Sequence, residues 1–177
     1  MRITPLPLAG LHLVEIEPAQ DARGLFARTY CEREFAAAGL ASRFVQASVS
    51  LTRRRGTLRG MHLQAPPHEE AKLVRCVRGR VYDVALDLRP GSPTFKRWHA
   101  LELDAEKRNA LYIPEGCAHG FQALEDECEL EYLMSAFYAP GAKRGVRWDD
   151  PAFGIAWPLP ATGVSEADRA FAPFRAA

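Results

Sequence analysis

Short apolar stretches, each ended by glycine, proline or charged residues, follow one another along almost the whole chain. Residues 79–89 (GRVYDVALDLR) show the pattern most clearly: even-numbered positions from Tyr82 to Leu88 are apolar, and odd-numbered positions from Val81 to Asp87 are mixed. Alternation with a period of two is typical of a β-strand. With 13 glycines and 13 prolines between such segments, the pattern favours an all-β sandwich or barrel over an alternating βαβ sheet.

Helical signals are few. Residues 32–41 predict one short helix ended by Gly39, and residues 164–171 predict another that begins at Ser165. The length of 177 residues matches one domain of ordinary size, and no linker or repeat divides the chain. We therefore expect a single domain over residues 1–177, with residues 140–177 packed as a tail on the rest.

Composition excludes several classes of protein. Lys and Arg number 23 and Asp and Glu number 22, a net charge of +1, so no bulk positive field is present to hold nucleic acid or an anionic membrane. No apolar run reaches the roughly 18 residues of a membrane helix, and the first residues lack the apolar stretch of a signal peptide. Four scattered cysteines show no paired spacing. These features predict a soluble cytoplasmic protein with no nucleic-acid or membrane partner.

Two of the five histidines lie in glycine-containing segments beside predicted strands: His62 in residues 58–64 (LRGMHLQ) and His119 in residues 113–121 (IPEGCAHGF). A histidine taken alone is more often a structural residue than a catalyst. However, the spacing Pro-x-Gly-x-x-His resembles the second half-motif of the cupin barrel, a jelly roll whose strands direct such side chains into its mouth. We therefore predict an all-β, cupin-type double-stranded β-helix or jelly-roll barrel with a few short helices.

Many cupins hold a metal ion, and this chain offers only a weak version of their ligand set. The corresponding residues are His62, Gln64, Glu69 and His119. The amide of Gln64 is a poor neutral ligand for a transition metal. We expect no metal site, and a metal-dependent cupin dioxygenase or isomerase remains the alternative function.

Further segments resemble the sugar-nucleotide epimerase family typified by dTDP-4-dehydrorhamnose 3,5-epimerase, in the order expected for that family. They are residues 21–26 (DARGLF), 57–62 (TLRGMH), 72–74 (KLV), 82–89 (YDVALDLR), 92–94 (SPT), 118–121 (AHGF), 148–151 (WDDP) and 165–168 (SEAD). The resemblance implies an isomerase without cofactor that acts on a nucleotide-diphosphate-linked 4-keto-6-deoxyhexose. It inverts C3, or both C3 and C5, as in dTDP-L-rhamnose and polysaccharide biosynthesis.

The resemblance also assigns four catalytic roles. His62 is the base, and an imidazole suits it because its ordinary pKa lies near neutral pH. Asp168 orients that imidazole, as an aspartate does in hydrolase triads. Lys72 supports the developing enolate oxygen as a fixed positive charge, and Tyr132 donates a proton from the opposite face of the sugar. A module that only binds sugar nucleotides would not need such an acid–base set.

Six further residues match substrate-binding positions of the family. Arg59 fits the diphosphate, because a guanidinium matches phosphate oxygens. His119 and Tyr138 correspond to the lining around the sugar. The nucleotide positions are Arg23, Gln46 and, in place of an asparagine, Ser48.

The positions around the nucleotide depart from the pattern of the thymidine enzymes. Arg28 and Lys143 stand where glutamates are expected, Ala47 and Ser48 replace Asp-Asn, and Ala167 replaces a lysine. Cations in place of carboxylates exchange hydrogen-bond acceptors for donors, which suits an acceptor-rich base better than the N3–H of thymine. The sequence therefore leaves dTDP, CDP and GDP open. The resemblance further implies a homodimer whose N-terminal strands cross to the partner, so that Arg23 completes the neighbouring site.

Overall fold

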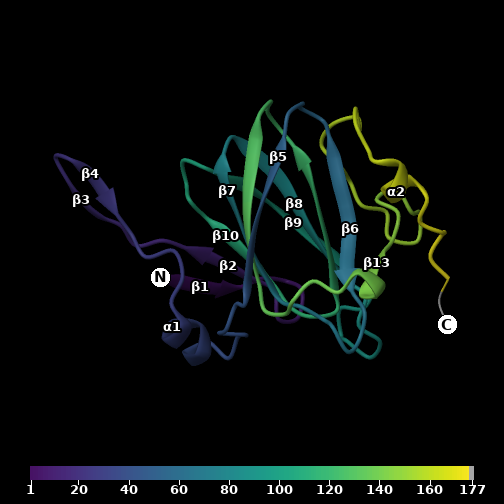
Figure 1. The fold of residues 1–177 in the computed structure, drawn as a ribbon, viewed down its shortest axis with the longest axis horizontal. Helices are drawn as coiled ribbons and strands as arrows, with labels where there is room; N and C mark the ends of the chain where they lie inside the picture. Colours follow the sequence, from purple (N-terminus) through teal and green to yellow (C-terminus); the bar gives the residue numbers. More distant parts are fainter. Residues whose placement is uncertain (176–177) are drawn as a thin grey trace.

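The computed structural model describes residues 1–175, and its elements form two facing antiparallel sheets (Figure 1). The six-stranded sheet has the order β1 (Arg2–Pro5), β2 (His12–Glu15), β10 (Ala110–Ile113), β7 (Lys72–Arg78), β12 (Cys128–Met134), β5 (Gln46–Thr52). The five-stranded sheet has the order β13 (Lys143–Gly145), β6 (Leu58–Gln64), β11 (Cys117–Ala123), β8 (Arg80–Asp87), β9 (Trp98–Asp104). The chain is mostly β-strand, as the short apolar segments separated by glycine and proline predicted.

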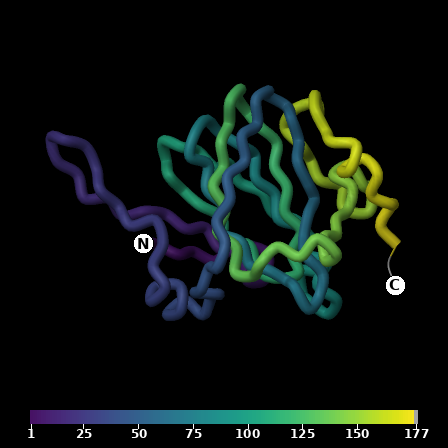
Figure 2. The backbone as a smooth tube through the Cα atoms, viewed as in Figure 1, coloured from purple at the N-terminus to yellow at the C-terminus, as the bar shows by residue number. Residues whose placement is uncertain are grey.

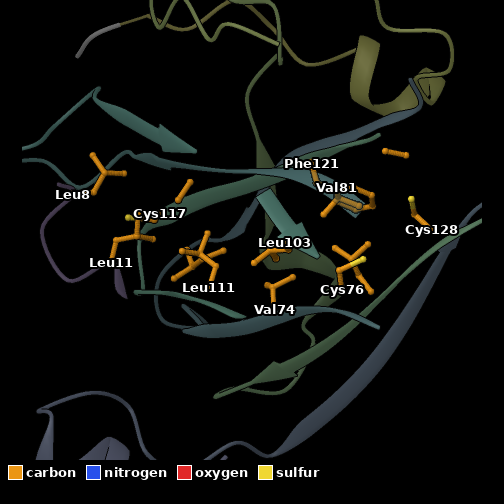
Figure 3. Packing of buried hydrophobic residues seen from close by; sticks show 14 residues of the cluster. Leu8, Leu11, Val74, Cys76, Val81, Leu103, Leu111, Cys117, Phe121 and Cys128 are labelled. Atoms are coloured by element: carbon orange, nitrogen blue, oxygen red, sulfur yellow. The ribbon is translucent and has the colours of Figure 1, made fainter. Parts of the chain in front are cut away.

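The space between the sheets holds the main hydrophobic core, which Figure 3 shows from close by. Val74 on β7 and Leu130 on β12 meet Val81 on β8 and Phe121 on β11, and all four side chains are at most 2% exposed. Burying side chains of this size removes enough apolar surface from water to hold the two sheets together. Another part of the space between the sheets is an open cavity lined by both polar and apolar side chains.

Both faces of β8 are buried, for different reasons. Its mixed face, which includes Asp83, is turned inward, because its neighbours Val81 and Ala85 belong to the core between the sheets. Its apolar face carries Val84 and Leu86, which pack beneath the C-terminal segment. The alternation seen in the sequence thus places Asp83 on the inward face of β8, and Val84 and Leu86 on the outward face.

The C-terminal segment covers the outside of the five-stranded sheet. It begins with a 3-10 turn, η1 (Pro140–Ala142), and β13, which pairs with β6. Phe153, Trp157 and Phe174 then pack over Val84 in a separate cluster, and Figure 2 shows this segment on the side away from the N-terminal hairpin. Residues 176–177, the end of the expected domain and tail, lie outside the described residues.

Two α-helices occur within residues 1–175, and both are shorter than the sequence predicted. α1 (Glu32–Ala37) ends before Gly39, and its Phe35 packs against Tyr112 on the outer face of the six-stranded sheet. α2 (Glu166–Arg169) starts at the predicted N-cap, Ser165. Within this part of the chain, no helix combines the length and apolar character needed to cross a membrane.

A third pair of strands, β3 (Ala19–Asp21) and β4 (Gly24–Phe26), forms a hairpin that projects away from the barrel (Figure 1). Its side chains are largely exposed, and Phe26 keeps 81% of its surface open. Phe26 pairs with Ala19 at the base of the hairpin, away from its turn, and it lacks the packing partners that the barrel gives to other aromatic residues.

Candidate active site

The backbones of the paired strands β6 and β11 approach each other unusually closely at Gly60, two residues before His62. Gly60 has φ +129, and a Cβ atom there would lie 2.5 Å from the Cα atom of Gly120 and 2.9 Å from the carbonyl oxygen of His119. Only glycine combines that backbone conformation with such an approach. Two residues later His62 pairs with His119 across the strands, and both side chains face the interior.

A cavity of about 670 Å³ opens between the two sheets beyond the core. One wall comes from β6 and β11, and the opposite wall from β5, β7 and β12. The charged and hydrogen-bonding side chains that line it are Ser50, Thr57, Arg59, His62, Gln64, Glu70, Lys72, His119, Tyr132, Tyr138, Lys143, Ser165 and Asp168. A cleft of this size that collects so many titratable groups is a site for chemistry on a small molecule.

His62 and Asp168 form a close pair, although 106 positions separate them in the sequence. The Nε2 atom of His62 lies 2.6 Å from Oδ1 of Asp168, whose side chain is only 5% exposed. The other carboxylate oxygen accepts from the backbone N–H of Gly60 at 3.3 Å. The N-cap Ser165 accepts from the N–H of Asp168 and so starts the helix that delivers this carboxylate.

This pair fixes which imidazole nitrogen is free. A carboxylate only accepts hydrogen bonds, so Nε2 of His62 carries the proton in the bond to Asp168, and Nδ1 keeps the lone pair in the neutral ring. Burial lowers the pKa of His62 and outweighs the bond to Asp168, which raises it. Lys143 and His119 lower this pKa further. The imidazole is therefore held neutral near pH 7, as a base requires.

Tyr132 stands on the opposite wall. It lies on β12 of the six-stranded sheet, whereas His62 belongs to the five-stranded sheet, and both line the same cavity. Its ring meets the ring of His119 edge-on, with 5.9 Å between the centroids. Burial raises the pKa of the Tyr132 phenol, so the hydroxyl keeps its proton and is suited to act as an acid.

Lys72 brings a positive charge to the cavity. Its Nζ atom lies 3.1 Å from Oε1 of Glu70 and 3.4 Å from the carbonyl oxygen of His62. The side chains of Lys72 and Glu70 are each 10% exposed, which leaves the ammonium group held in place in a largely dry environment. Such a fixed cation stabilises negative charge that develops on a bound molecule.

The imidazole of His119 is held by a carboxylate on the neighbouring strand β8. Its Nε2 atom lies 3.0 and 2.9 Å from the two carboxylate oxygens of Asp83, which is fully buried on β8. A buried carboxylate of this kind needs a hydrogen-bonding partner. His119 is therefore a fixed part of the same wall as His62, and its ring faces Tyr132 on the opposite wall.

Besides His119, three of the predicted binding residues lie at or beside this cavity. Arg59 and Tyr138 line it, and the N–H of Tyr138 donates to Oε1 of Gln46 at 2.8 Å. The guanidinium of Arg59 donates only to neutral oxygens, Oγ1 of Thr52 and the carbonyl of Leu51. It is thus positioned by the strand, and no carboxylate within residues 1–175 pairs with its charge.

Other predicted positions lie apart from the cavity in this chain. Arg23 is on the projecting hairpin, with its side chain 90% exposed and paired with Asp21. Ser48 borders a shallow surface groove beside Ala47 instead of the cavity. Arg28 pairs with Glu34 near α1 at 3.0 Å. A single chain therefore does not gather the full set of expected nucleotide contacts.

The alternative metal set is not assembled. Gln64 uses its amide fully, because Nε2 donates to Glu70 and Oε1 accepts from the N–H of Ala139. Glu69 borders a different depression, and Nε2 of His119 is bound to Asp83. Across residues 1–175, no three His, Cys, Asp or Glu side chains are grouped as metal ligands. The donor set does not fit the metal-dependent alternative.

Two residues that the sequence analysis did not name complete the site. Asp83, the partner of His119, had a signal: it is an acidic residue within the alternating pattern of a buried strand. Glu70, the partner of Lys72, lies two positions before it in a run of polar residues. Nothing in that run distinguishes Glu70 from Glu69, and only the path of the chain into β7 turns one of them inward.

The fold and the cavity together define a cupin-type barrel with acid–base groups on facing walls. A family model for dTDP-4-dehydrorhamnose 3,5-epimerase matches residues 5–176. The chain belongs to the dTDP-4-dehydrorhamnose 3,5-epimerase family and is an epimerase, which confirms the resemblance and the fold class expected from the sequence.

Individual relatives cover nearly the whole chain. A dTDP-4-dehydrorhamnose 3,5-epimerase from Methanothermobacter thermautotrophicus is 43% identical over 98% of this chain and 95% of its own length. A dTDP-4-dehydrorhamnose 3-epimerase from Streptomyces niveus is 42% identical over 96% of this chain and 82% of its own. The crystal structure of the Bacillus anthracis 3,5-epimerase is 33% identical, with a TM-score of 0.94 over 98% of this chain and 99% of that one.

Proposed function

We propose that this protein inverts C3, or both C3 and C5, of a 4-keto-6-deoxyhexose linked to a nucleoside diphosphate, as in dTDP-L-rhamnose biosynthesis. The observation that carries the proposal is the bond of 2.6 Å between His62 and Asp168 at the wall of a cavity whose opposite wall carries Tyr132. Inversion requires proton removal on one face of a carbon and proton delivery on the other. A base and an acid on facing walls meet that requirement.

In the proposed first step, Nδ1 of His62 takes the proton from the carbon next to the C4 ketone. The electron pair of that C–H bond moves into the new C–C double bond, and the ketone oxygen becomes an enolate oxygen. Asp168 holds the imidazolium that forms. Lys72, fixed by Glu70, faces the negative oxygen and lowers the energy of the enolate.

In the second step, the phenol of Tyr132 gives its proton to the same carbon from the opposite face, and the ketone is restored. His62 releases its proton to solvent, and the phenolate of Tyr132 regains one, so the protein returns to its starting state. Repeating the sequence at C5 uses the same groups after the sugar turns in the cavity. Arg59, whose charge no carboxylate in the described part of the chain neutralises, binds the diphosphate.

The test of the base is hydrogen exchange in deuterated water, followed by NMR of the nucleotide sugar. His62→Asn should abolish exchange at C3 and C5, because the side chain can no longer accept a proton. His12→Asn is the matched control, since His12 lies on β2 outside the cavity lining and its ring nitrogen is bonded to the carbonyl of Gly10. Exchange at the wild-type rate in His62→Asn would reject the proposal, and the positions labelled by wild-type protein distinguish inversion at C3 from inversion at both carbons.

The nucleotide is tested separately. The Bacillus anthracis relative was solved with TDP and PPi bound, which favours dTDP, whereas Lys143, which lines the cavity, favours a base richer in acceptors. Titration with dTDP, CDP and GDP decides between them. If dTDP binds at least as tightly as CDP and GDP, the argument that cations in place of carboxylates favour an acceptor-rich base is rejected.

We also propose that residues 1–177 form one catalytic domain that works as a homodimer. The projecting hairpin carries an unpacked Phe26 and an exposed Arg23. A second copy that covers Phe26 would bring Arg23 to the neighbouring cavity, which lacks this guanidinium in the single chain.

A further inference from the structure

The segment that carries Asp168 also places an aromatic ring against the base. Phe171, three residues after Asp168, meets the imidazole of His62 edge-on, with 6.1 Å between the ring centroids and 61° between the planes. Edge-to-face contacts of this kind favour one orientation of the two rings. His62 therefore touches residues 165–171 at two points, a carboxylate and a phenyl ring.

A glycine on β13 makes room for that phenyl ring. A Cβ atom at Gly145 would lie 2.3 Å from Cζ of Phe171 and 2.5 Å from the carbonyl oxygen of Met61. Gly145 is also the residue that pairs with His62 between β13 and β6. The ring of Phe171 thus occupies the place that any other residue beside His62 would fill with its own side chain.

We propose that Phe171 is a positioning residue for the base: its ring and the carboxylate of Asp168 hold the imidazole of His62 from two sides. The inference deepens the proposed function and rests on it, because the orientation of the His62 imidazole matters only if His62 is the base. Asp168 binds Nε2 of His62. Phe171 limits rotation of the imidazole and access of water to it. Nδ1 of His62 remains free to contact the substrate.

Replacing Phe171 with a smaller residue changes the surroundings of the imidazole in a defined direction. Four charged or titratable groups face His62 from the elements packed around it, and they stay in place: Asp168 on α2, Lys143 on β13, His119 on β11 and Lys72 on β7. Only the apolar cover is lost. Because burial lowers the pKa of His62, removing that cover should raise the pKa toward its ordinary value of about 6.5.

The experiment compares Phe171→Ala and Phe171→Leu with Phe174→Ala. Phe174 lies in the same segment but packs on Phe153, with 4.9 Å between the centroids, instead of on His62. Two quantities are measured: the midpoint of the His62 imidazole signal in an NMR titration without substrate, assigned with His62→Asn, and kcat and KM for epimerisation.

Phe171→Ala should raise the NMR midpoint and lower kcat by about tenfold or more, since a misplaced base loses its alignment, while KM stays within about twofold. Phe171→Leu should show the same changes at smaller size, because it keeps part of the apolar cover, and it replaces the alanine variant if that variant folds poorly. Phe174→Ala should leave the midpoint unchanged.

An unchanged midpoint in both Phe171 variants, or an equal change in Phe174→Ala, would overturn the inference. The second result would mean that the whole tail acts through stability alone. Failure of the proposed function is recognised separately, because exchange in His62→Asn would then continue whatever the NMR midpoint of the Phe171 variants is.

Discussion

The imidazole of His62 is subject to opposing influences on its pKa, and their balance makes a prediction about pH. A base accepts a proton only when it is neutral, so activity is present above the pKa of His62 and is lost as the pH falls through it. Burial lowers this pKa from the ordinary imidazole value of about 6.5. The acid limb of kcat/KM, which reports the free enzyme, should therefore have its midpoint below 6.5. A midpoint above 6.5 would contradict the assignment.

Asp168→Asn tests the partner of that base. The carboxylate raises the pKa of His62, so its removal should move the acid limb to lower pH. It should also reduce kcat by on the order of 100-fold, because a positioned base contributes that much and the amide no longer fixes the nitrogen that carries the proton. Rates are measured on both sides of the acid limb. A shift of the limb to higher pH would show that another group sets it.

Tyr132→Phe separates proton removal from proton delivery. The buried phenol keeps its proton, and its loss leaves His62 able to form the enolate but leaves no acid on the opposite wall. Exchange at C3 should continue in deuterated water, whereas net inversion should fall by about 100-fold or more. Tyr82→Phe removes a hydroxyl from the outer face of the five-stranded sheet, where Tyr82 packs on Trp157 outside the cavity, and serves as the control that keeps inversion. Equal loss of exchange and inversion in Tyr132→Phe would place Tyr132 outside the acid role.

Sequence motifs identify single residues more readily than their partners. His62, Lys72, Tyr132 and Asp168 were all selected in advance, and the structure places all four at one cavity. Asp83 was not selected, because an acidic residue in a strand is read as solvent-facing until the opposite sheet is known to cover it. Glu70, the partner of Lys72, was likewise not recognised as such.

At the scale of elements, the close approach of β6 to its sheet neighbour β11 depends on Gly60, and this can be tested against a matched glycine. Gly60→Ala adds a Cβ atom that would meet the backbone of Gly120 at 2.5 Å, at a φ of +129. Gly91 also has a positive φ, +82, but nothing lies within 4 Å of a Cβ atom there. The two substitutions therefore share backbone strain and differ in steric overlap.

Gly91→Ala should cost about 1 kcal/mol of unfolding free energy, from strain alone. Gly60→Ala should cost on the order of 4 kcal/mol, because two backbones must separate, and it should disturb His62 two residues later. Denaturant unfolding gives both values. Equal costs for the two variants would mean that β6 and β11 separate easily, and that the close approach does not fix the site.

The extent of elements was harder to predict than their type. Ser165 was correctly identified as an N-cap, since a serine before an acidic turn has a local reason to start a helix. The predicted helix over residues 32–41 ends at Ala37, because Phe35 anchors only one turn and a half against the sheet. Local residues signal where a helix begins, while the surface it packs on decides how far it continues.

At the scale of the whole molecule, the all-β class followed from strand alternation, but the pairing of strands did not. β5 pairs with β12 and β6 pairs with β11, contacts between segments about 60 to 80 positions apart that no local pattern encodes. The jelly-roll order was expected only through the half-motif around His119. Without that resemblance, periodicity alone would have left sandwich and barrel equally open.

The whole-molecule proposal, a dimer with shared sites, predicts that two inactive variants restore each other. His62→Asn lacks the base, and Arg23→Ala lacks the guanidinium that its hairpin would give to the neighbour. When the two are unfolded and refolded together, half of the dimers should be mixed, and each mixed dimer should hold one complete site. Activity should then reach about a quarter of that of the wild type.

A mixture of His62→Asn with Asp168→Asn is the matched control. His62 and Asp168 bond to each other within one chain at 2.6 Å, so no mixed dimer of these two variants contains an intact pair, and activity should stay at the level of the separate variants. A gain with Arg23→Ala but not with Asp168→Asn requires that Arg23 act across the subunit boundary, while the base and its carboxylate act within one subunit. If neither mixture gains activity, Arg23 does not act in the neighbouring site, and the proposal of shared sites is wrong.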